Sequence, residues 1–256
     1  MSSETLLRGR IASSGWVWLD LDDTVIDFRA NSREALHIIY GACGLDRYFP
    51  SVGVWTEAYL RHNHRLWDLY NIGDITQAHL RLHRFLDPLG EVADSGDPAV
   101  RELAAGLDGV YLDILAERRN MVPGAVELMR HLRAEGYRVG ILSNGFTGVQ
   151  NRKMDVNGLR ELTDLLVLSD DIGVNKPDVR LFRHAMERAG ELDPRRHTMI
   201  GDNPSTDILG AVRAGWNAIL YAPGGAVLPE GVRGDEIVVS GRLEALCGLF
   251  SPSESV

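Results

Sequence analysis

Gly15-Trp-Val-Trp-Leu-Asp-Leu-Asp-Asp-Thr24 is a short apolar run that ends in three carboxylates. Such a run is typical of a strand that is buried on both faces, as in a parallel sheet. Asp20 and Asp22 lie two residues apart, so an extended chain places both carboxylates on one face. Asp and Thr also cap helix N-termini, and on this stretch alone capping and chemistry are open alternatives.

Downstream of Val122, strand patterns alternate with helix patterns. The expected strands cover residues 137–142, 165–169, 197–200, 218–221 and 236–239. The expected helices cover residues 123–135, 147–156, 177–189, 205–214 and 242–247. This alternation predicts an α/β fold, a Rossmann-like parallel sheet with helices on both faces.

Residues 31–119 show helical periodicity and no good strand pattern, which predicts four helices, one of them spanning about 52–70. The expected apolar stripes are Ala35, Leu36, Ile39 and Tyr40; Val54, Ala58, Leu66 and Leu69; Ile75, Ala78, Leu82, Phe85 and Leu86; and Leu103, Leu107, Val110 and Ile114. The simplest architecture is an α/β domain over residues 15–28 and 120–250 with an all-helical insertion over 29–119. The polar ends, 1–14 and 251–256, are expected to be tails.

Composition narrows the class of protein. The net charge of −9 over 256 residues disfavours a nucleic acid polymer or an acidic membrane as a partner. No apolar run approaches the roughly 18 residues of a membrane span, and the first residues lack the apolar core of a secretory signal. Two cysteines without a CxxC pattern favour a reducing, cytoplasmic setting. Among 27 basic residues only Lys153 and Lys176 are lysines, and Lys153 is expected at the surface.

Polar motifs follow four of the expected strands, where parallel α/β sheets bind ligands. After the first strand they are Ser143-Asn144-Gly145, Asn175-Lys176-Pro177, and Gly201-Asp202 through Asp207. Each motif has a purely structural interpretation: Ser143-Asn144-Gly145 could be a turn, Lys176 a solvated cation, and Asp202 and Asp207 helix caps. Each motif also has a functional interpretation, because backbone amides at a helix start bind anions and carboxylates bind divalent ions. Four such motifs in one order favour the functional interpretation.

In this order the motifs resemble those of the haloacid-dehalogenase (HAD) superfamily of phosphohydrolases. The family pattern is DxDxT, a Ser or Thr that ends a strand, a Lys, and GDxxxxD. The present chain matches all four, over about residues 16–221. Three sequence segments, residues 20–32, 141–146 and 171–178, resemble those of the branch that contains pyrimidine 5′-nucleotidases. The resemblance implies that the helical insertion is a cap that covers the site.

The resemblance also implies a role for each motif residue. Asp20 is the expected nucleophile and Asp22 the expected acid and base. Lys176 is expected to neutralise charge, and Thr24, Ser143, Asn144 and Gly145 to bind the substrate. A Mg²⁺ ion is expected on Asp20, Asp202 and the backbone carbonyl of Asp22, with Asp207 as a further ligand or a support behind the ligands.

The implied activity is Mg²⁺-dependent hydrolysis of phosphate monoesters through an aspartyl-phosphate, on nucleoside 5′-monophosphates. Other small phosphorylated metabolites, such as phosphoglycolate or sugar phosphates, are the alternative. A dehalogenase and a non-catalytic phosphate-binding protein are weaker hypotheses, because Asp22 and Asp202 are both present. The partner is a small metabolite, and the chain is expected to be a monomer or a homodimer. Aromatic and histidine side chains of the cap are substrate-binding candidates, although core packing is the commoner role: Phe28, Trp55, Tyr59, His62, His64, Trp67 and Tyr70.

Overall fold

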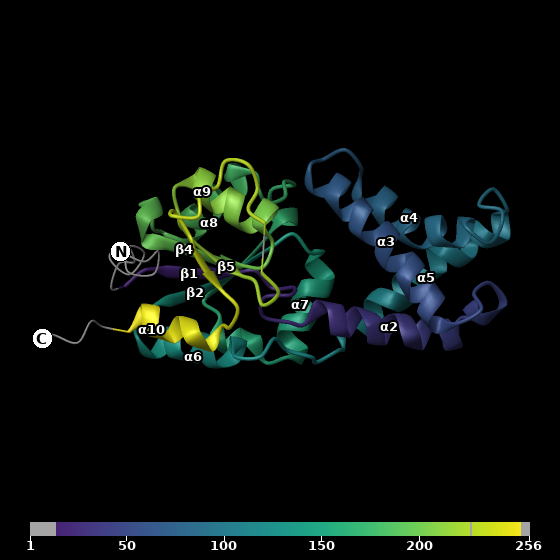
Figure 1. Ribbon diagram of the computed structural model, residues 1–256, viewed down its shortest axis with the longest axis horizontal. Helices are drawn as coiled ribbons and strands as arrows, with labels where there is room; N and C mark the ends of the chain where they lie inside the picture. Colours follow the sequence, from purple (N-terminus) through teal and green to yellow (C-terminus); the bar gives the residue numbers. More distant parts are fainter. Residues whose placement is uncertain (1–13, 226, 252–256) are drawn as a thin grey trace, which may run out of the picture. The chain divides into compact units, whose positions relative to one another are not determined.

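A computed structural model describes residues 14–225 and 227–251, and the chain divides into two compact units (Figure 1). The helical unit consists of residues 28–119 and 148–156. The α/β unit consists of the residues up to Asp27, residues 120–147 and the chain from Asn157 onward. Of the expected tails, only Ser14 and Ser251 lie among the described residues.

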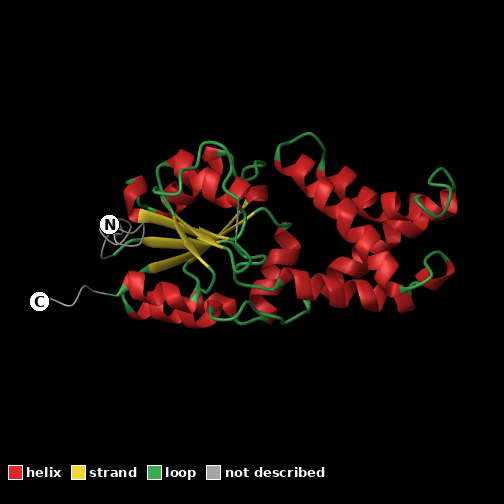
Figure 2. Cartoon of the chain, in the orientation of Figure 1, coloured by secondary structure: helices red, strands yellow, loops and turns green. Residues whose placement is uncertain are grey.

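The α/β unit is built on a six-stranded sheet in the order β3-β2-β1-β4-β5-β6, in which every pair is parallel (Figure 2). Strand β1 lies between β2 and β4, so its carboxyl end is flanked by the ends of both neighbours. The predicted parallel α/β fold is confirmed. The strands are β1 (Trp16–Leu19), β2 (Arg138–Ser143), β3 (Leu165–Leu168), β4 (His197–Gly201), β5 (Asn217–Tyr221) and β6 (Val238–Ser240).

Helices cover both faces of this sheet, with α8 and α9 over one face and α6 and α10 over the other (Figure 1). Beneath α8 and α9, Trp18 of β1 packs in a core with Phe182 and Trp216. Gly140 on β2 makes room for this indole, because a Cβ there would lie 2.3 Å from the Trp18 ring. The helices are α6 (Ala125–Ala134), α8 (Val179–Ala189), α9 (Leu209–Ala214) and α10 (Cys247–Phe250).

Several helix boundaries differ from the sequence prediction. Helix α8 begins at Val179 rather than Pro177, because the Asp178 side chain accepts a hydrogen bond from the Arg180 N–H and caps the helix. The helix expected over 205–214 opens with a π-helical turn, Pro204–Ile208, before α9. The last helix lies at Cys247–Phe250 rather than 242–247.

In the helical unit, the four predicted stripes correspond to four helices, although Ile75 of the third stripe lies before its helix: α2 (Phe28–Ala42), α3 (Val52–Asn71), α4 (Gln77–Gly90) and α5 (Pro98–Ala116). The buried face of α5 is rotated from the expected one, since Tyr111 is fully buried while Val110 is 41% exposed. On α3, Val54 is likewise 49% exposed and Trp55 is buried. At these two positions the aromatic neighbour, rather than the expected valine, joins the buried core.

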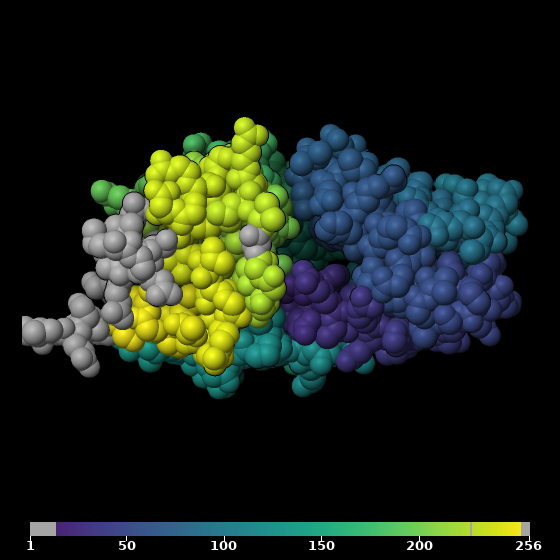
Figure 3. Space-filling model, viewed as in Figure 1, coloured from purple at the N-terminus to yellow at the C-terminus, as the bar shows by residue number. Residues whose placement is uncertain are grey.

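An aromatic cluster forms the centre of this unit. Trp55, Tyr59, Phe85 and Tyr111 are fully buried, and adjacent ring centroids lie 5.0 to 6.3 Å apart. Figure 3 shows the exterior of helices α2 to α4, beneath which this cluster is packed. The core interpretation of Trp55 and Tyr59 is confirmed, so neither ring is available to stack on a substrate in this structure.

Helix α7 (Thr147–Val156) follows the second motif, and its residues 148–156 belong to the helical unit rather than to the expected 120–250 domain. Arg152 on this helix contacts the same unit, since its guanidinium lies 2.6 Å from Glu117 and 3.1 Å from Asp113, both on or just after α5. Lys153 is 3% exposed, and its Nζ lies 5.3 Å from the ring centroid of Phe28. The expectation that Lys153 is a surface residue is therefore wrong.

Among the described residues, none of the helices combines the length and the apolar character that a membrane crossing requires.

Candidate active site

The first motif forms a tight turn directly after β1. The Asp20 N–H still donates to the Ile200 carbonyl of β4 at 2.9 Å, which holds Asp20 at the edge of the sheet. The chain then reverses, with Asp23 at φ +60°, a left-handed conformation that Asp tolerates better than most residues. Asp23 thus serves the turn, whereas Asp20 is 8% exposed and Thr24 is fully buried.

Asp22 lies in the same turn and is half-buried, where its charge helps to raise the pKa of Asp20. Strand β1 ends at Leu19, so both carboxylates of the first motif lie beyond the strand, in the turn that follows it.

The fourth motif follows β4 and presents two carboxylates. Asp207 is 1% exposed, and its Oδ2 accepts a hydrogen bond from the Asn203 N–H at 3.1 Å. Gly201 is required for this contact, because a Cβ there would lie 2.3 Å from Asp207 Oδ2. The Asn203 side chain caps the following turn by accepting from the N–H groups of Ser205 and Thr206. Capping in this motif is therefore done by Asn203, which leaves Asp202 and Asp207 for another role.

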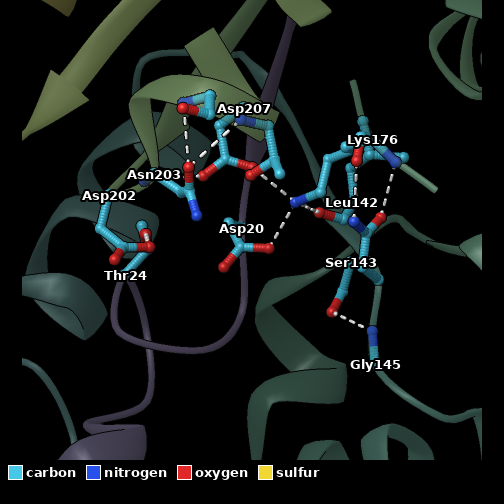
Figure 4. Close-up of polar contacts among 12 residues, drawn as sticks. Asp20, Thr24, Leu142, Ser143, Gly145, Lys176, Asp202, Asn203 and Asp207 are labelled. Carbon is cyan, nitrogen blue, oxygen red and sulfur yellow. Dashed lines mark hydrogen bonds and ion pairs between the residues drawn. The ribbon is translucent and has the colours of Figure 1, made fainter. Parts of the chain in front are cut away.

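Lys176 joins the first motif to the fourth (Figure 4). Its Nζ lies 2.5 Å from Asp20 Oδ1, 2.7 Å from Asp207 Oδ1 and 2.7 Å from the Leu142 carbonyl oxygen. The Asp20 carboxylate and the Leu142 carbonyl accept hydrogen bonds from this ammonium, and Asp207 forms an ion pair with it. Lys176 is 2% exposed, so the alternative of a solvated cation is excluded.

The second motif ends β2 and is linked to the third. Ser143 is 2% exposed, and its Oγ accepts a hydrogen bond from the Gly145 N–H at 3.1 Å (Figure 4). The Asn144 side chain bonds to both backbone groups of Lys176: its Oδ1 accepts from the Lys176 N–H at 2.8 Å, and its Nδ2 donates to the Lys176 carbonyl at 3.0 Å. The sequence indicated a substrate-binding role for Asn144 but not this contact, which joins residues 32 positions apart.

Three carboxylates form a potential cation site. One oxygen from each of Asp20, Asp202 and Asp207 lies within 4.8 Å of the other two, and Thr24 Oγ1 donates to Asp202 Oδ1 at 3.4 Å. The ammonium of Lys176 balances one of these three charges, so the four groups together carry a net charge of −2 when all are ionised. An all-oxygen donor set with this surplus suits Mg²⁺, which prefers carboxylate and water ligands.

Burial and the charges of neighbouring carboxylates make two of these acids, Asp20 and Asp202, unusually weak. Burial, then Asp207 and Asp20, raises the pKa of Asp202 to about 8. Burial also raises the pKa of Asp20, to about 7, although Lys176 opposes the shift. Burial lowers the pKa of Lys176, but Asp20 and Asp207 outweigh it, and the net shift is upward. The ammonium therefore stays charged at neutral pH, whereas a further cation would favour full ionisation of Asp20 and Asp202.

Comparisons with known proteins show to which family the chain is similar. The model of the family "Hydrolase: haloacid dehalogenase-like hydrolase" matches residues 16–215. Pyrimidine 5′-nucleotidase YjjG of Escherichia coli is 32% identical over 205 residues, covering 78% of this chain and 82% of that protein. Phosphoserine phosphatase of Thermus thermophilus is 30% identical over 222 residues, covering 78% and 86%.

A solved structure shares the fold. The crystal structure of the HAD-hydrolase YfnB from Bacillus subtilis, bound to magnesium, aligns with a TM-score of 0.79 over 92% of this chain and 98% of that one. Its sequence identity is 24%, so the likeness establishes the fold alone.

Proposed function

Because the chain belongs to the haloacid dehalogenase-like hydrolase family, we propose that it is a Mg²⁺-dependent phosphate monoester hydrolase. The observation that carries this proposal is the buried Lys176, bonded to Asp20 and Asp207, beside a carboxylate surplus that includes Asp202. A nucleophilic carboxylate and a phosphate repel each other, and this arrangement supplies cationic charge at the point where they would meet.

Asp20 is the nucleophile in this mechanism. One of its carboxylate oxygens forms a bond to phosphorus, and the bond from phosphorus to the ester oxygen breaks on the opposite side. Asp22 gives its proton to the leaving alkoxide. It then takes a proton from a water molecule whose oxygen attacks the phosphorus of the aspartyl-phosphate, which releases inorganic phosphate and restores Asp20.

The remaining residues hold charge in place. Lys176 balances the negative charge on Asp20 and on the transferring phosphoryl group. Ser143, oriented by the Gly145 N–H, donates its O–H to a phosphate oxygen. Asp20, Asp202 and Asp207, with the backbone carbonyl of Asp22, are the groups that would hold or support Mg²⁺. The ion, when bound, supplies Lewis-acid stabilisation of the phosphoryl oxygens.

Nucleoside 5′-monophosphates are the proposed substrate class, and the 32% identity to a pyrimidine 5′-nucleotidase over most of both chains supports it. Other small phosphorylated metabolites are the second candidate, because a phosphoserine phosphatase is 30% identical over a similar share. A screen of phosphate release from uridine and cytidine 5′-monophosphates, phosphoserine, phosphoglycolate and sugar phosphates separates the two. A sugar phosphate or phosphoglycolate favoured tenfold or more in kcat/KM would replace the nucleotide proposal.

The hydrolase proposal is tested with an aryl phosphate and purified protein. We expect turnover that requires Mg²⁺, stops in excess chelator and is abolished in Asp20→Asn, a variant of almost unchanged volume that retains the fold. Circular dichroism checks the fold of the variant. Full activity of Asp20→Asn, or full activity in chelator, would refute the mechanism.

A further inference from the structure

The Asn144 side chain forms two hydrogen bonds with the backbone of Lys176, the lysine of the candidate active site. Its amide exchanges two hydrogen bonds with one residue, accepting from the Lys176 N–H at 2.8 Å and donating to the Lys176 carbonyl at 3.0 Å. Residues paired across neighbouring β-strands exchange bonds in this way, through peptide groups. Here a side-chain amide takes the place of the neighbouring strand.

Lys176 needs such a partner because it lies in no strand or helix. It belongs to the connection between β3, which ends at Leu168, and α8, which begins at Val179. Nearby turns in this connection are closed by local bonds, such as Gly173 N–H to the Ser169 carbonyl at 2.9 Å and Asp178 N–H to the Asn175 carbonyl at 2.9 Å. The backbone bonds of Lys176 go instead to Asn144, at the end of β2.

The position of the Lys176 backbone matters because its ammonium must satisfy three acceptors at once. The acceptors come from three segments: Asp20 after β1, Leu142 on β2 and Asp207 after β4. A long, flexible side chain reaches such a point reproducibly only when its Cα is fixed. Asn144 follows Leu142 and Ser143 directly, so it fixes that Cα relative to the strand that carries one of the acceptors.

Another asparagine shows that this contact is more than turn formation. Asn203 also follows a strand of the sheet, but its side chain bonds to N–H groups two and three residues along the chain, which is ordinary capping. Asn144 instead reaches across 32 residues, from the second motif to the third.

We propose that Asn144 is a positioning residue for catalysis, which fixes Lys176 through its side-chain amide and so holds the ammonium against the nucleophile Asp20. This inference rests on the proposed function and adds a role to it. The phosphate-binding role expected for this motif uses backbone amides, which Asn144→Ala retains. Removing the side chain therefore separates the two roles.

The test compares Asn144→Ala with a matched control, Asn217→Ala. Asn217, at the start of β5, also uses its amide to bond backbone, donating to the Arg195 and His197 carbonyls at 3.1 and 3.3 Å, but at the opposite end of the strands. With an aryl phosphate and Mg²⁺, we expect Asn144→Ala to lose roughly 10- to 100-fold in kcat with KM changed less than about threefold. Asn217→Ala should keep wild-type kcat, although both variants lower Tm.

A double-mutant cycle identifies the residue through which Asn144 acts. In the Lys176→Met background, Asn144→Ala should cause no further loss of kcat, because the ammonium that it positions is gone. An undiminished further loss would overturn the proposal, and so would a lower Tm with unchanged kcat in the single variant. If Asn144→Ala does not fold, Asn144→Asp replaces it, since Asp keeps the size but presents an acceptor to the Lys176 carbonyl, and the same loss of kcat is expected.

A crystal structure of Asn144→Ala distinguishes failure of this inference from failure of the proposed function. We expect Lys176 Nζ to have left Asp20 Oδ1, whatever reaction the protein catalyses. An Nζ that stays in place overturns the positioning role. A wild-type chain that releases no phosphate overturns the proposed function, while the displacement of Lys176 would still support the structural claim.

Discussion

Each of the two units buries a cluster of charged side chains, and the clusters differ in their balance of charge. In the helical unit, Arg84 is 3% exposed and bonds through its guanidinium to Asp108 Oδ1. Arg81 bonds to the other oxygen of the same carboxylate at 2.6 Å. The Arg84 guanidinium also lies over the rings of Phe85 and Tyr111, 5.4 and 5.2 Å from their centroids. Two cations share one carboxylate there, and Arg81, the more exposed of the two, also contacts solvent.

In the α/β unit the ratio is reversed. Asp20, Asp202 and Asp207 lie together, and two of them, Asp20 and Asp207, contact the ammonium of Lys176. Burial and the charges of neighbouring carboxylates raise the pKa of Asp20 and of Asp202. Retaining such a surplus costs stability, because each buried charge loses its hydration. The buried Arg84–Asp108 pair is explained by packing, whereas the carboxylate surplus around Lys176 is the arrangement that the proposed Mg²⁺ site requires.

The largest effect on stability is expected from Asp108→Asn. The change leaves Arg84 buried without its carboxylate, and breaking a buried pair in this way costs about 3–5 kcal/mol. Thermal or denaturant unfolding measures the loss. Asp113→Asn is the control, since its carboxylate is 77% exposed and pairs with Arg152 at the surface, where such pairs contribute about 0–1 kcal/mol. Equal losses in the two variants would contradict the distinction between buried and exposed pairs.

The second prediction concerns pH in the absence of metal. In the folded chain the pKa of Asp20 is raised to about 7 and that of Asp202 to about 8, from an ordinary value of 3.8. Between the ordinary and the raised pKa values, the folded state therefore binds more protons than the unfolded state. Their contribution to the free energy of unfolding is therefore present at low pH and declines as pH rises from about 4 to about 8. In chelator, Asp202→Asn should gain Tm relative to wild type, and the gain should grow with pH.

Excess Mg²⁺ should reverse the sign of that difference, because a bound cation stabilises the ionised carboxylates that the variant lacks. A Tm difference that is independent of both pH and Mg²⁺ would show that the carboxylate surplus is not a cation site.

The third prediction is a loss of roughly tenfold or more in kcat for Lys176→Arg, which corresponds to about 1.4 kcal/mol of transition-state stabilisation. Three acceptors within 2.7 Å of one nitrogen suit a compact ammonium, and a planar guanidinium fork cannot place one nitrogen among all of them. Steady-state kinetics with an aryl phosphate measures the loss. Wild-type kcat/KM in the variant would mean that only the charge matters.

The smallest effect is expected for Lys153→Arg, and it falls on stability. Lys153 is buried over Phe28 in the helical unit, so the larger guanidinium must displace its neighbours, at a cost of about 1 kcal/mol. Unfolding measures the loss. The two lysines thus respond differently to one substitution, Lys176 in turnover and Lys153 in Tm. A Tm unchanged by Lys153→Arg would show that the space around residue 153 accommodates the larger guanidinium.

The sheet and its motifs could be predicted because their signals are local. A short apolar run ending in carboxylates, such as Trp16–Asp22, indicates both a buried strand and polar groups at its end. The parallel arrangement then brings the ends of several strands to one edge, which is how Asp20 and Asp202 could be placed together. The interior position of Trp55 and Tyr59 was likewise predicted, although the apolar stripe expected on the same helix also included Val54, which is exposed.

Contacts that depend on the path of a connection or on how helices pack could not be predicted. Nothing in the residues around Asn144 indicates that its amide would bond to the Lys176 backbone, because that contact depends on the path of the connection after β3. Lys153 lies on α7, where no apolar stripe marks an inward face, so its burial depends on which helices α7 packs against.

The sequence by itself determined that each motif follows a strand, that a helical segment is inserted, and which residue types are available for chemistry. These features could be predicted because hydrophobic periodicity and strand ends are properties of short segments. Only the tertiary structure decided which charges are balanced. Asp108 shares its carboxylate between Arg81 and Arg84, whereas Lys176 stands alone among three carboxylates. Electrostatic balance depends on distances of a few ångströms between side chains from separate elements, and no spacing along the chain encodes those distances.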